Sequence, residues 1–133
     1  MAVVSSETVP VISEPDIVIA RQRVREVTSQ IGFSLVDQTK LVTAASELAR
    51  NTLIYGGGGS MQVERLNGPR LGVRLVFHDD GPGIPDIELA LRDGFTTGSG
   101  LGLGLSGTKR LVNEFEIESQ VGRGTTVTVT RWK

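Results

Sequence analysis

The chain has 133 residues, enough for one domain with a buried core. Its 14 lysines and arginines nearly balance its 15 aspartates and glutamates, so it lacks the excess of basic residues typical of proteins that bind nucleic acids or anionic membranes. The lack of cysteine excludes disulfides and thiolate metal sites, and the single histidine, His78, argues against Ser-His or Cys-His catalysis. The N-terminus is unlike a signal peptide and no apolar run is long enough to span a membrane, so we expect a cytoplasmic protein.

The N-terminal residues predict a tail followed by a short strand. Residues 1–7 are expected to form a flexible tail, and residues 8–133 a single domain. Thr8–Ile12 is a strand candidate. Pro10 lacks a backbone N–H, so this strand is expected at the edge of a sheet.

Two helices are predicted next. Each begins at a serine with an acidic residue three positions later, and they run from Ser13 to Gly32 and from Ser34 to about Tyr55. The faces expected to be buried carry Ile17, Ala20, Val24 and Val27 in the first helix, and Leu41, Ala44, Ala45, Leu48, Thr52 and Tyr55 in the second. Glu47 and Asn51 are four residues apart, so a carboxylate and an amide share one face at the margin of the second stripe.

The remainder of the chain predicts two hairpins separated by a helical region. The strands are expected at Met61–Leu66, Leu71–Phe77, Phe115–Ser119 and Thr125–Trp132, and the helices at Asp86–Arg92 and Thr108–Glu114. This order predicts an α+β fold, a two-layer α/β sandwich in which helices cover one face of a mostly antiparallel sheet.

A glycine-rich stretch runs from Gly94 to Arg110, with six glycines among 17 residues. Bare backbone N–H groups, followed by a helix that begins where the glycines end, would suit a phosphate; a flexible linker is the alternative. The stretch contains G-x-G-x-x-G, but no apolar strand precedes it as a dinucleotide fingerprint requires. It also fails as a P-loop, because Thr108 stands where the lysine is needed.

Four short motifs occur in a fixed order along the chain. They are Glu47-Leu-Ala-Arg-Asn51, Asp79-Asp-Gly81-Pro-Gly83, the alternating glycines from Gly98 to Gly104, and Gly124-Thr125. Together they resemble the N, G1, G2 and G3 boxes of the GHKL (Bergerat-fold) ATPases, which include histidine kinases, Hsp90, MutL and gyrase B. The resemblance covers roughly residues 10–131 and implies the Bergerat, histidine-kinase-like ATPase fold.

The resemblance is strongest to one subgroup. The segments DDGPGIPD, DGFTTGSGLGLGLSGTKRLVNEF and VGRGTTV look like the serine/threonine switch kinases of the bacterial stressosome, the RsbT type. The related anti-sigma-factor kinases of the RsbW and SpoIIAB kind commonly have a histidine four residues after the N-box asparagine. This chain has Tyr55 there, which favours the switch-kinase branch.

The resemblance implies that the protein binds ATP and Mg²⁺. Asn51 would ligate Mg²⁺, Glu47 would be the general base, and Asp79 would read the adenine. The remaining candidates for nucleotide binding are Gly81, Gly83, Ile84, Thr97, Gly98, Gly100, Leu101, Gly102, Leu103, Gly104, Leu105 and Thr125. Ordinary alternatives stay open: Asn51 as a locally bonded helix amide, and Thr125 as a plain strand residue. Glu47 could instead pair with Arg50 at the surface.

These features predict a kinase that transfers the γ-phosphoryl group of ATP to serine or threonine of a partner. By resemblance, the partners would be STAS-domain antagonist and co-antagonist proteins of the stressosome, and a PP2C-type phosphatase that the kinase activates by binding. The alternatives are an anti-sigma factor or ATP-gated binding switch, and a histidine-kinase-like fragment acting on a separate phosphoacceptor. Gly94–Arg110 would be a short ATP lid that becomes ordered with nucleotide.

Overall fold

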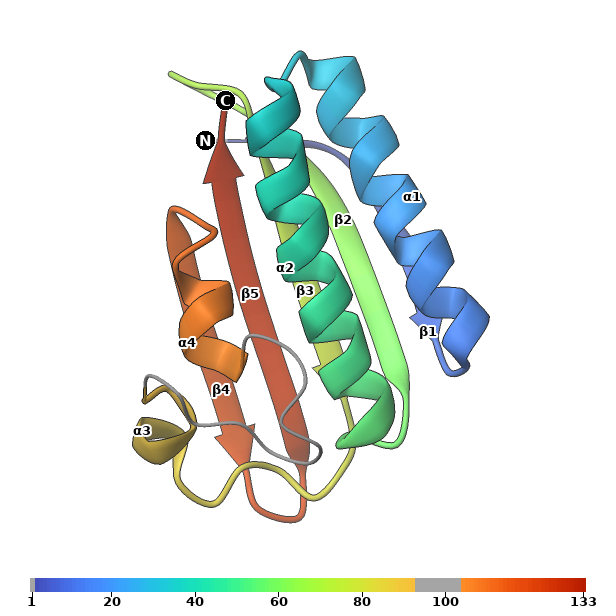
Figure 1. Ribbon diagram of the computed structural model, residues 1–133, viewed down its shortest axis with the longest axis vertical. Coiled ribbons are helices and arrows are strands. Elements are labelled where there is room, and N and C mark those ends of the chain that lie inside the picture. The colour runs from blue at the N-terminus through green and yellow to red at the C-terminus, as the bar shows by residue number, and fades with distance from the viewer. Residues whose placement is uncertain (1, 93–103) are drawn as a thin grey trace.

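The computed structural model describes residues 2–92 and 104–133, which form a five-stranded sheet with helices over one face (Figure 1). The elements are β1 (Ala2–Val11), α1 (Glu14–Ile31), α2 (Leu35–Ile54), β2 (Gly59–Asn67), β3 (Gly72–Asp79), α3 (Ile87–Ala90), α4 (Gly104–Lys109), β4 (Glu114–Gln120) and β5 (Gly124–Trp132). The strand order is β1-β2-β3-β5-β4, and every neighbouring pair is antiparallel. The predicted fold class and both predicted hairpins are confirmed.

The two long helices follow the sequence prediction closely. α1 ends at Gly32, whose φ of 97° is the left-handed conformation that glycine adopts at little cost. α2 begins after Ser34, whose Oγ accepts the Asp37 N–H at 3.1 Å. The expected side-chain cap at Ser13 is absent; instead, Asp16 accepts the Ile12 N–H at 2.9 Å.

The first residues of the chain differ from the expected tail. β1 begins at Ala2, and its residues pair with β2 from Ala2–Asn67 to Val11–Gly59, with an irregularity between Val3 and Ser5. An edge strand needs only one neighbour, and β2 offers a long partner. Residues 2–7 are therefore strand, although β1 does lie at the sheet edge, as Pro10 indicated.

The helical region also differs from the prediction. α4 ends at Lys109, and β4 begins at Glu114, where a helix over Thr108–Glu114 was expected. The Asn113 N–H already donates to Thr130 O on β5 at 2.9 Å, so the sheet captures this segment. In β4 exposed residues alternate with half-buried ones, a period of two that a helix cannot satisfy. α3 is likewise shorter than expected, with Asp86 as its N-cap.

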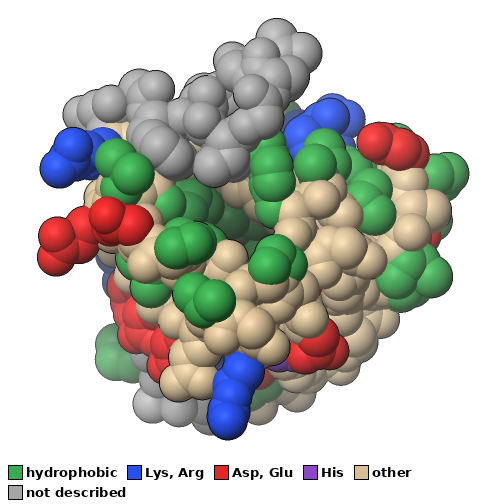
Figure 2. Space-filling model, turned by 90° about the horizontal axis from the view of Figure 1, so that it is seen from below, with side chains coloured by type: hydrophobic (Ala, Val, Ile, Leu, Met, Phe, Trp, Pro, Cys, Tyr) green, Lys and Arg blue, Asp and Glu red, His purple; other side chains and the backbone are tan. Residues whose placement is uncertain are grey.

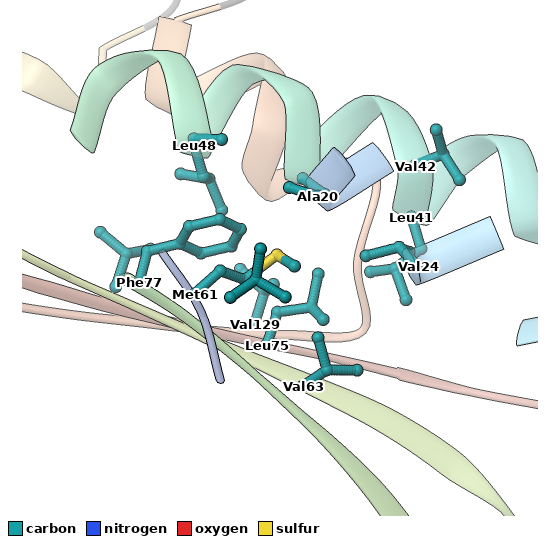
Figure 3. Packing of buried hydrophobic residues seen from close by; sticks show 14 of the residues in the cluster. Ala20, Val24, Leu41, Val42, Leu48, Met61, Val63, Leu75, Phe77 and Val129 are labelled. Atoms are coloured by element: carbon teal, nitrogen blue, oxygen red, sulfur yellow. The ribbon is translucent and has the colours of Figure 1, made fainter. Parts of the chain in front are cut away.

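The core lies between the sheet and the two long helices. Figure 3 shows Leu41 and Leu48 of α2 pointing toward Met61, Leu75 and Val129 of the sheet. The four α1 residues expected to be buried are all buried, and so is the α2 stripe except for Tyr55, which is 40% exposed. Burial of these faces against the sheet fixes α2 above β3, with its last turn at one end of the sheet (Figure 1).

The other face of the sheet carries polar side chains. Its cross-strand pairs include Glu64 with Arg74, which also form an ion pair, and Thr128 with Glu116. His78 lies on this face and contacts Thr126 Oγ1 through Nδ1 at 2.9 Å. Within residues 2–92 and 104–133, no helix has the length and apolar character needed to traverse a bilayer.

Candidate functional site

A cavity of about 540 Å³ opens where the last turns of α2 meet the ends of β3 and β5. Seen from below, hydrophobic side chains surround this hollow (Figure 2). Eight of the predicted site residues line it: Glu47, Asn51, Asp79, Gly83, Ile84, Gly104, Leu105 and Thr125. The fold therefore brings together residues from all four sequence motifs, with Gly104 representing the alternating glycines.

The other predicted site residues do not line the cavity or cannot be placed. Gly81 is not among the lining residues, and the side of its Cα where a Cβ would be attached packs closely against the backbone of Gly56. Thr97, Gly98, Gly100, Leu101, Gly102 and Leu103 lie outside the described residues. Their proposed roles remain predictions from the sequence.

α2 supplies the polar wall of the cavity. Its buried stripe packs on the sheet, so Glu47 and Asn51 lie half-buried at the boundary between core and opening. The helix ends just beyond them, where the Asn51 carbonyl accepts the N–H groups of both Tyr55 and Gly56, at 3.0 and 3.2 Å. A carboxylate and an amide thus stand one turn apart at the mouth of the cavity.

Asp79 is the buried acid of the site. It ends β3 with 8% of its surface exposed, and its Oδ1 accepts the Gly81 N–H at 2.9 Å. A Cβ on Gly56 would lie 2.3 Å from the Asp79 Cγ, closer than any real contact. The hydrogen bond from Gly81 and the close approach of Gly56 restrict where the carboxylate can lie, and a carboxylate oxygen can accept a hydrogen bond from a ligand.

The turn after β3 is fixed to the β4–β5 hairpin. The Gly122 N–H donates to Pro82 O at 2.8 Å, and the Ile84 N–H donates to Ser119 Oγ at 2.7 Å. A Cβ on Gly83 would lie 2.3 Å from Gln120 O, so only glycine allows the two backbones to approach this closely. The turn is therefore a rigid floor for the cavity.

Thr125 completes the wall opposite α2. It pairs with Asp79 in the β3–β5 register, and its Oγ1 lies 2.8 Å from Ser119 Oγ. Sequence reasoning missed Ser119. Its signal was its place in the predicted second hairpin, which puts it directly across from Thr125.

Other lining residues were also missed. The cavity is further lined by Arg50, Ile54, Tyr55, Gly56, Pro82 and Ala90. Most are apolar, and an aromatic base prefers such a wall. The sequence analysis placed Tyr55 on the buried face of the second helix and used it as a marker of the subgroup, although its place one turn after Asn51 could have identified it as a site residue.

The acidic groups do not suffice to bind a metal ion on their own. In the part of the chain that the structure describes, no three His, Cys, Asp or Glu side chains lie close enough together to hold one. Mg²⁺ commonly keeps water and phosphate oxygens and takes only one or two protein ligands. One amide oxygen beside a cavity, as Asn51 provides, is compatible with that mode of binding.

The sequence of residues 36–133 matches the family model "Histidine kinase-, DNA gyrase B-, and HSP90-like ATPase". This match covers well over half of the chain, and the fold and the cavity agree with it. The chain therefore belongs to this ATPase family, the GHKL family.

Two relatives narrow the class further. The chain is 45% identical over 125 residues to the serine/threonine-protein kinase RsbT of Bacillus subtilis, covering 93% of this chain and 94% of that protein. It is 34% identical over 117 residues to the anti-sigma F factor of Geobacillus kaustophilus, covering 81% and 78%. These similarities make the chain an ATP-dependent serine/threonine-protein kinase of the partner-switching type.

Solved structures support the fold. The RsbU and RsbW domains of a Mycobacterium tuberculosis protein superimpose with a TM-score of 0.67 at 22% identity, covering 96% of this chain and 32% of that longer chain. The mycobacterial sensor histidine kinase MprB superimposes with a TM-score of 0.56 at 22% identity, covering 96% of this chain and 97% of that one. At such identities the likeness concerns the fold alone.

Proposed function

We propose that this protein transfers the γ-phosphoryl group of ATP to a serine or threonine of STAS-domain antagonist and co-antagonist proteins, and that it also binds a PP2C-type phosphatase. It would act in the cytoplasm, where ATP and such partners are found together. The observation that supports the proposal most is the joint presence of Glu47, Asn51 and Asp79 in one cavity. One carboxylate would recognise the adenine, the amide would ligate Mg²⁺, and the other carboxylate would accept the proton of the attacking hydroxyl. Together they would position the nucleotide and the metal ion and assist the transfer.

The base of ATP would bind at the buried end of the cavity. Adenine presents an exocyclic amine, and the oriented Asp79 carboxylate can accept its N–H. Guanine has a carbonyl oxygen at that position, which a carboxylate repels, so the site selects ATP over GTP. Thr125 and Ile84 border the same end of the cavity.

The phosphates would extend toward the mouth of the cavity, near Asn51 and the start of α4. Gly104 and Leu105 line the cavity there, and the predicted phosphate-binding glycines directly precede them in sequence. When bound, Mg²⁺ would neutralise phosphate charge, with Asn51 as its protein ligand.

Glu47 is the proposed general base. Its carboxylate would accept the proton of the partner's hydroxyl as that oxygen forms its bond to the γ-phosphorus. The bond between the γ-phosphorus and the bridging oxygen breaks, and ADP leaves. Glu47 lies at the cavity mouth, where a protein substrate can reach, and one helical turn from Asn51.

The proposal is tested by incubating the protein with Mg²⁺, γ-labelled ATP and STAS-domain proteins encoded nearby. Acid-stable label on serine or threonine is expected. Acid-labile label would instead indicate transfer to histidine, and would contradict the proposal. A pull-down with PP2C-type phosphatases tests the second partner separately, with phosphatase activity as the readout.

An anti-sigma factor or ATP-gated binding switch is the second candidate. The 34% identity to an anti-sigma F factor favours it. ATP-dependent complex formation without phosphoryl transfer would support this candidate over the first. Tyr55, which lines the cavity where those relatives commonly have histidine, argues for the kinase branch.

A further inference from the structure

Three side chains form a row across the sheet beneath the cavity. The register pairs Ser119 of β4 with Thr125 of β5, and Thr125 with Asp79 of β3. The three residues share the helix-covered face, since they occupy equivalent positions in neighbouring strands. Asp79 and Thr125 line the cavity, whereas Ser119 lies behind Thr125 and does not.

Ser119 Oγ has three hydrogen-bond contacts, and its one proton and two lone pairs can satisfy all three only if Thr125 donates to it and it donates to Gly124 O. Its Oγ accepts the Ile84 N–H at 2.7 Å, and it lies 2.8 Å from Thr125 Oγ1 and 3.1 Å from Gly124 O. A serine hydroxyl has one proton and two lone pairs, and the Ile84 N–H occupies one of the lone pairs. The proton must therefore go to either Gly124 O or Thr125 Oγ1.

The choice decides what Thr125 presents to the cavity. If Ser119 donates to Gly124 O, the Thr125 hydroxyl can donate to Ser119, and it offers only lone pairs to a ligand. If Ser119 donates to Thr125, the Thr125 proton is released toward the cavity. A purine edge carries donors and acceptors side by side, so the hydroxyl of Thr125 can match either kind of atom.

We propose that Ser119 is a positioning residue for base recognition: it sets the hydrogen-bonding direction of the Thr125 hydroxyl and holds the Ile84 wall against the base. This inference rests on the proposed ATP-binding role of the cavity and adds a residue that does not touch the nucleotide. Ser119 thereby couples the β4–β5 hairpin to the turn after β3, which carries one side of the base site.

The test is nucleotide affinity, measured by calorimetry for ATP and for inosine triphosphate, whose base has a carbonyl in place of the exocyclic amine. Ser119→Ala is expected to weaken ATP binding about tenfold, as loss of one to two hydrogen bonds would. Its ratio of ATP to inosine triphosphate affinity should fall. Ser119→Thr, which keeps the hydroxyl, should have the wild-type ratio of ATP to inosine triphosphate affinity. Thr128→Val, on the same strand as Thr125 but on the opposite face, is the matched control and should leave both affinities unchanged.

A double variant tests whether Ser119 acts through Thr125. If it does, adding Ser119→Ala to Thr125→Val should cost much less than in the wild type, because the two groups share one hydrogen bond. Equal losses of affinity for both nucleotides in Ser119→Ala, or additive effects in the double variant, would indicate a merely structural role and overturn the inference.

Asp79→Asn separates this inference from the proposed function. If Asp79→Asn loses ATP affinity while Ser119→Ala binds like the wild type, the inference fails and the nucleotide site stands. If Asp79→Asn binds ATP as tightly as the wild type, the proposed nucleotide-binding role of the cavity fails, whatever the result for Ser119→Ala. Thermal unfolding of each variant confirms that the changes in affinity arise in folded protein.

Discussion

Individual side chains at the mouth of the cavity have separable roles. Glu47 and Asn51 occupy successive turns of α2, so they share one face, and in the proposed mechanism they would contribute different chemistry, a general base and a neutral oxygen ligand. Asp79 lies deeper, and its carboxylate accepts a hydrogen bond from the backbone N–H of Gly81. A substitution at the mouth should therefore affect transfer, and one at the buried end should affect nucleotide binding.

Replacing the proposed base tests this division. Glu47→Gln should lower the rate of phosphoryl transfer about 100-fold or more, because general-base catalysis typically contributes this much. ATP affinity should change little, since the carboxylate acts on the partner's hydroxyl. Single-turnover transfer and calorimetry measure the two quantities. Glu116→Gln, on the uncovered face of the sheet, is the control; an unchanged rate in Glu47→Gln would refute the assignment.

Gly56 tests whether Asp79 must be held in one orientation. Gly56→Ala would place its Cβ 2.5 Å from Asp79 Oδ2. Overpacking of this kind costs about 1–3 kcal/mol of strain, which the Asp79 carboxylate would relieve by moving out of its position. Because that carboxylate is proposed to bind the adenine, ATP affinity should fall about tenfold. Gly57→Asn is the control, because nothing lies within 4 Å of a Cβ there and asparagine tolerates its φ of 76°. Equal ATP affinities in both variants would contradict the steric explanation.

At the scale of elements, one ion pair joins three segments. Arg131 of β5 donates to Asp37 in the first turn of α2 at 2.7 Å and to Leu111 O after α4 at 3.0 Å. The donated hydrogen bond from Arg131 lowers the pKa of Asp37 below its ordinary value of 3.8. The Arg131 Nε–H is buried without a partner among the described residues, which offsets part of what the pair contributes.

This pair predicts an acid-sensitive step in stability. Because the pKa of Asp37 is lower in the folded state than in the unfolded state, the pair stabilises the protein above about pH 4. The contribution is lost as the pH falls through the lowered pKa. Asp37→Asn should be less stable at pH 6 by about 1 kcal/mol, given its partly solvated position, and should lack this acid-dependent loss.

Urea unfolding between pH 6 and pH 2.5 measures both effects. Glu118→Gln, at an exposed position on the uncovered face of the sheet, serves as the control and should keep the wild-type pH profile. The same profile in Asp37→Asn and the wild type would show that the ion pair does not set the acid response.

At the scale of the whole molecule, β1 completes the sheet. Val9 and Val11 are 6% and 0% exposed, so the first strand contributes to the core. Replacing both with alanine should lower the free energy of unfolding by about 3 kcal/mol, as lost burial and cavities together predict. Val4→Ala, at a position 64% exposed, should change stability by less than about 0.5 kcal/mol. Chemical denaturation compares the two, and equal losses would mean that β1 does not pack as described.

The sequence predicted the long elements because their patterns were strong. α1 and α2 carry regular apolar stripes, and Gly32 and Ser34 set their limits. Residues 2–7 have no such stripe, and they are ordered only by pairing with β2, a long-range contact that local patterns do not reveal. The start of β4 at Glu114 was missed for the same reason, since β5 decides the conformation there.

Parts of the candidate site were predictable from motifs and others only from topology. The family boxes supplied Glu47, Asn51 and Asp79, whose side chains would face the ligand. Ser119 and Gly56 act from behind those residues, and only strand register and backbone proximity reveal them. Motif reasoning finds the groups that touch a substrate more readily than those that hold them in place.

The close packing of glycines around Asp79 also limits which residues this chain can accept at those positions. A Cβ on Gly124 would lie 2.1 Å from Asp79 O, and one on Gly81 would lie 2.7 Å from the Gly56 Cα. Any side chain at these positions would displace the backbone around Asp79, so glycine is required there if the carboxylate is to stay in place. A change of base preference in this protein would therefore have to come from side chains such as Thr125, with these glycines retained.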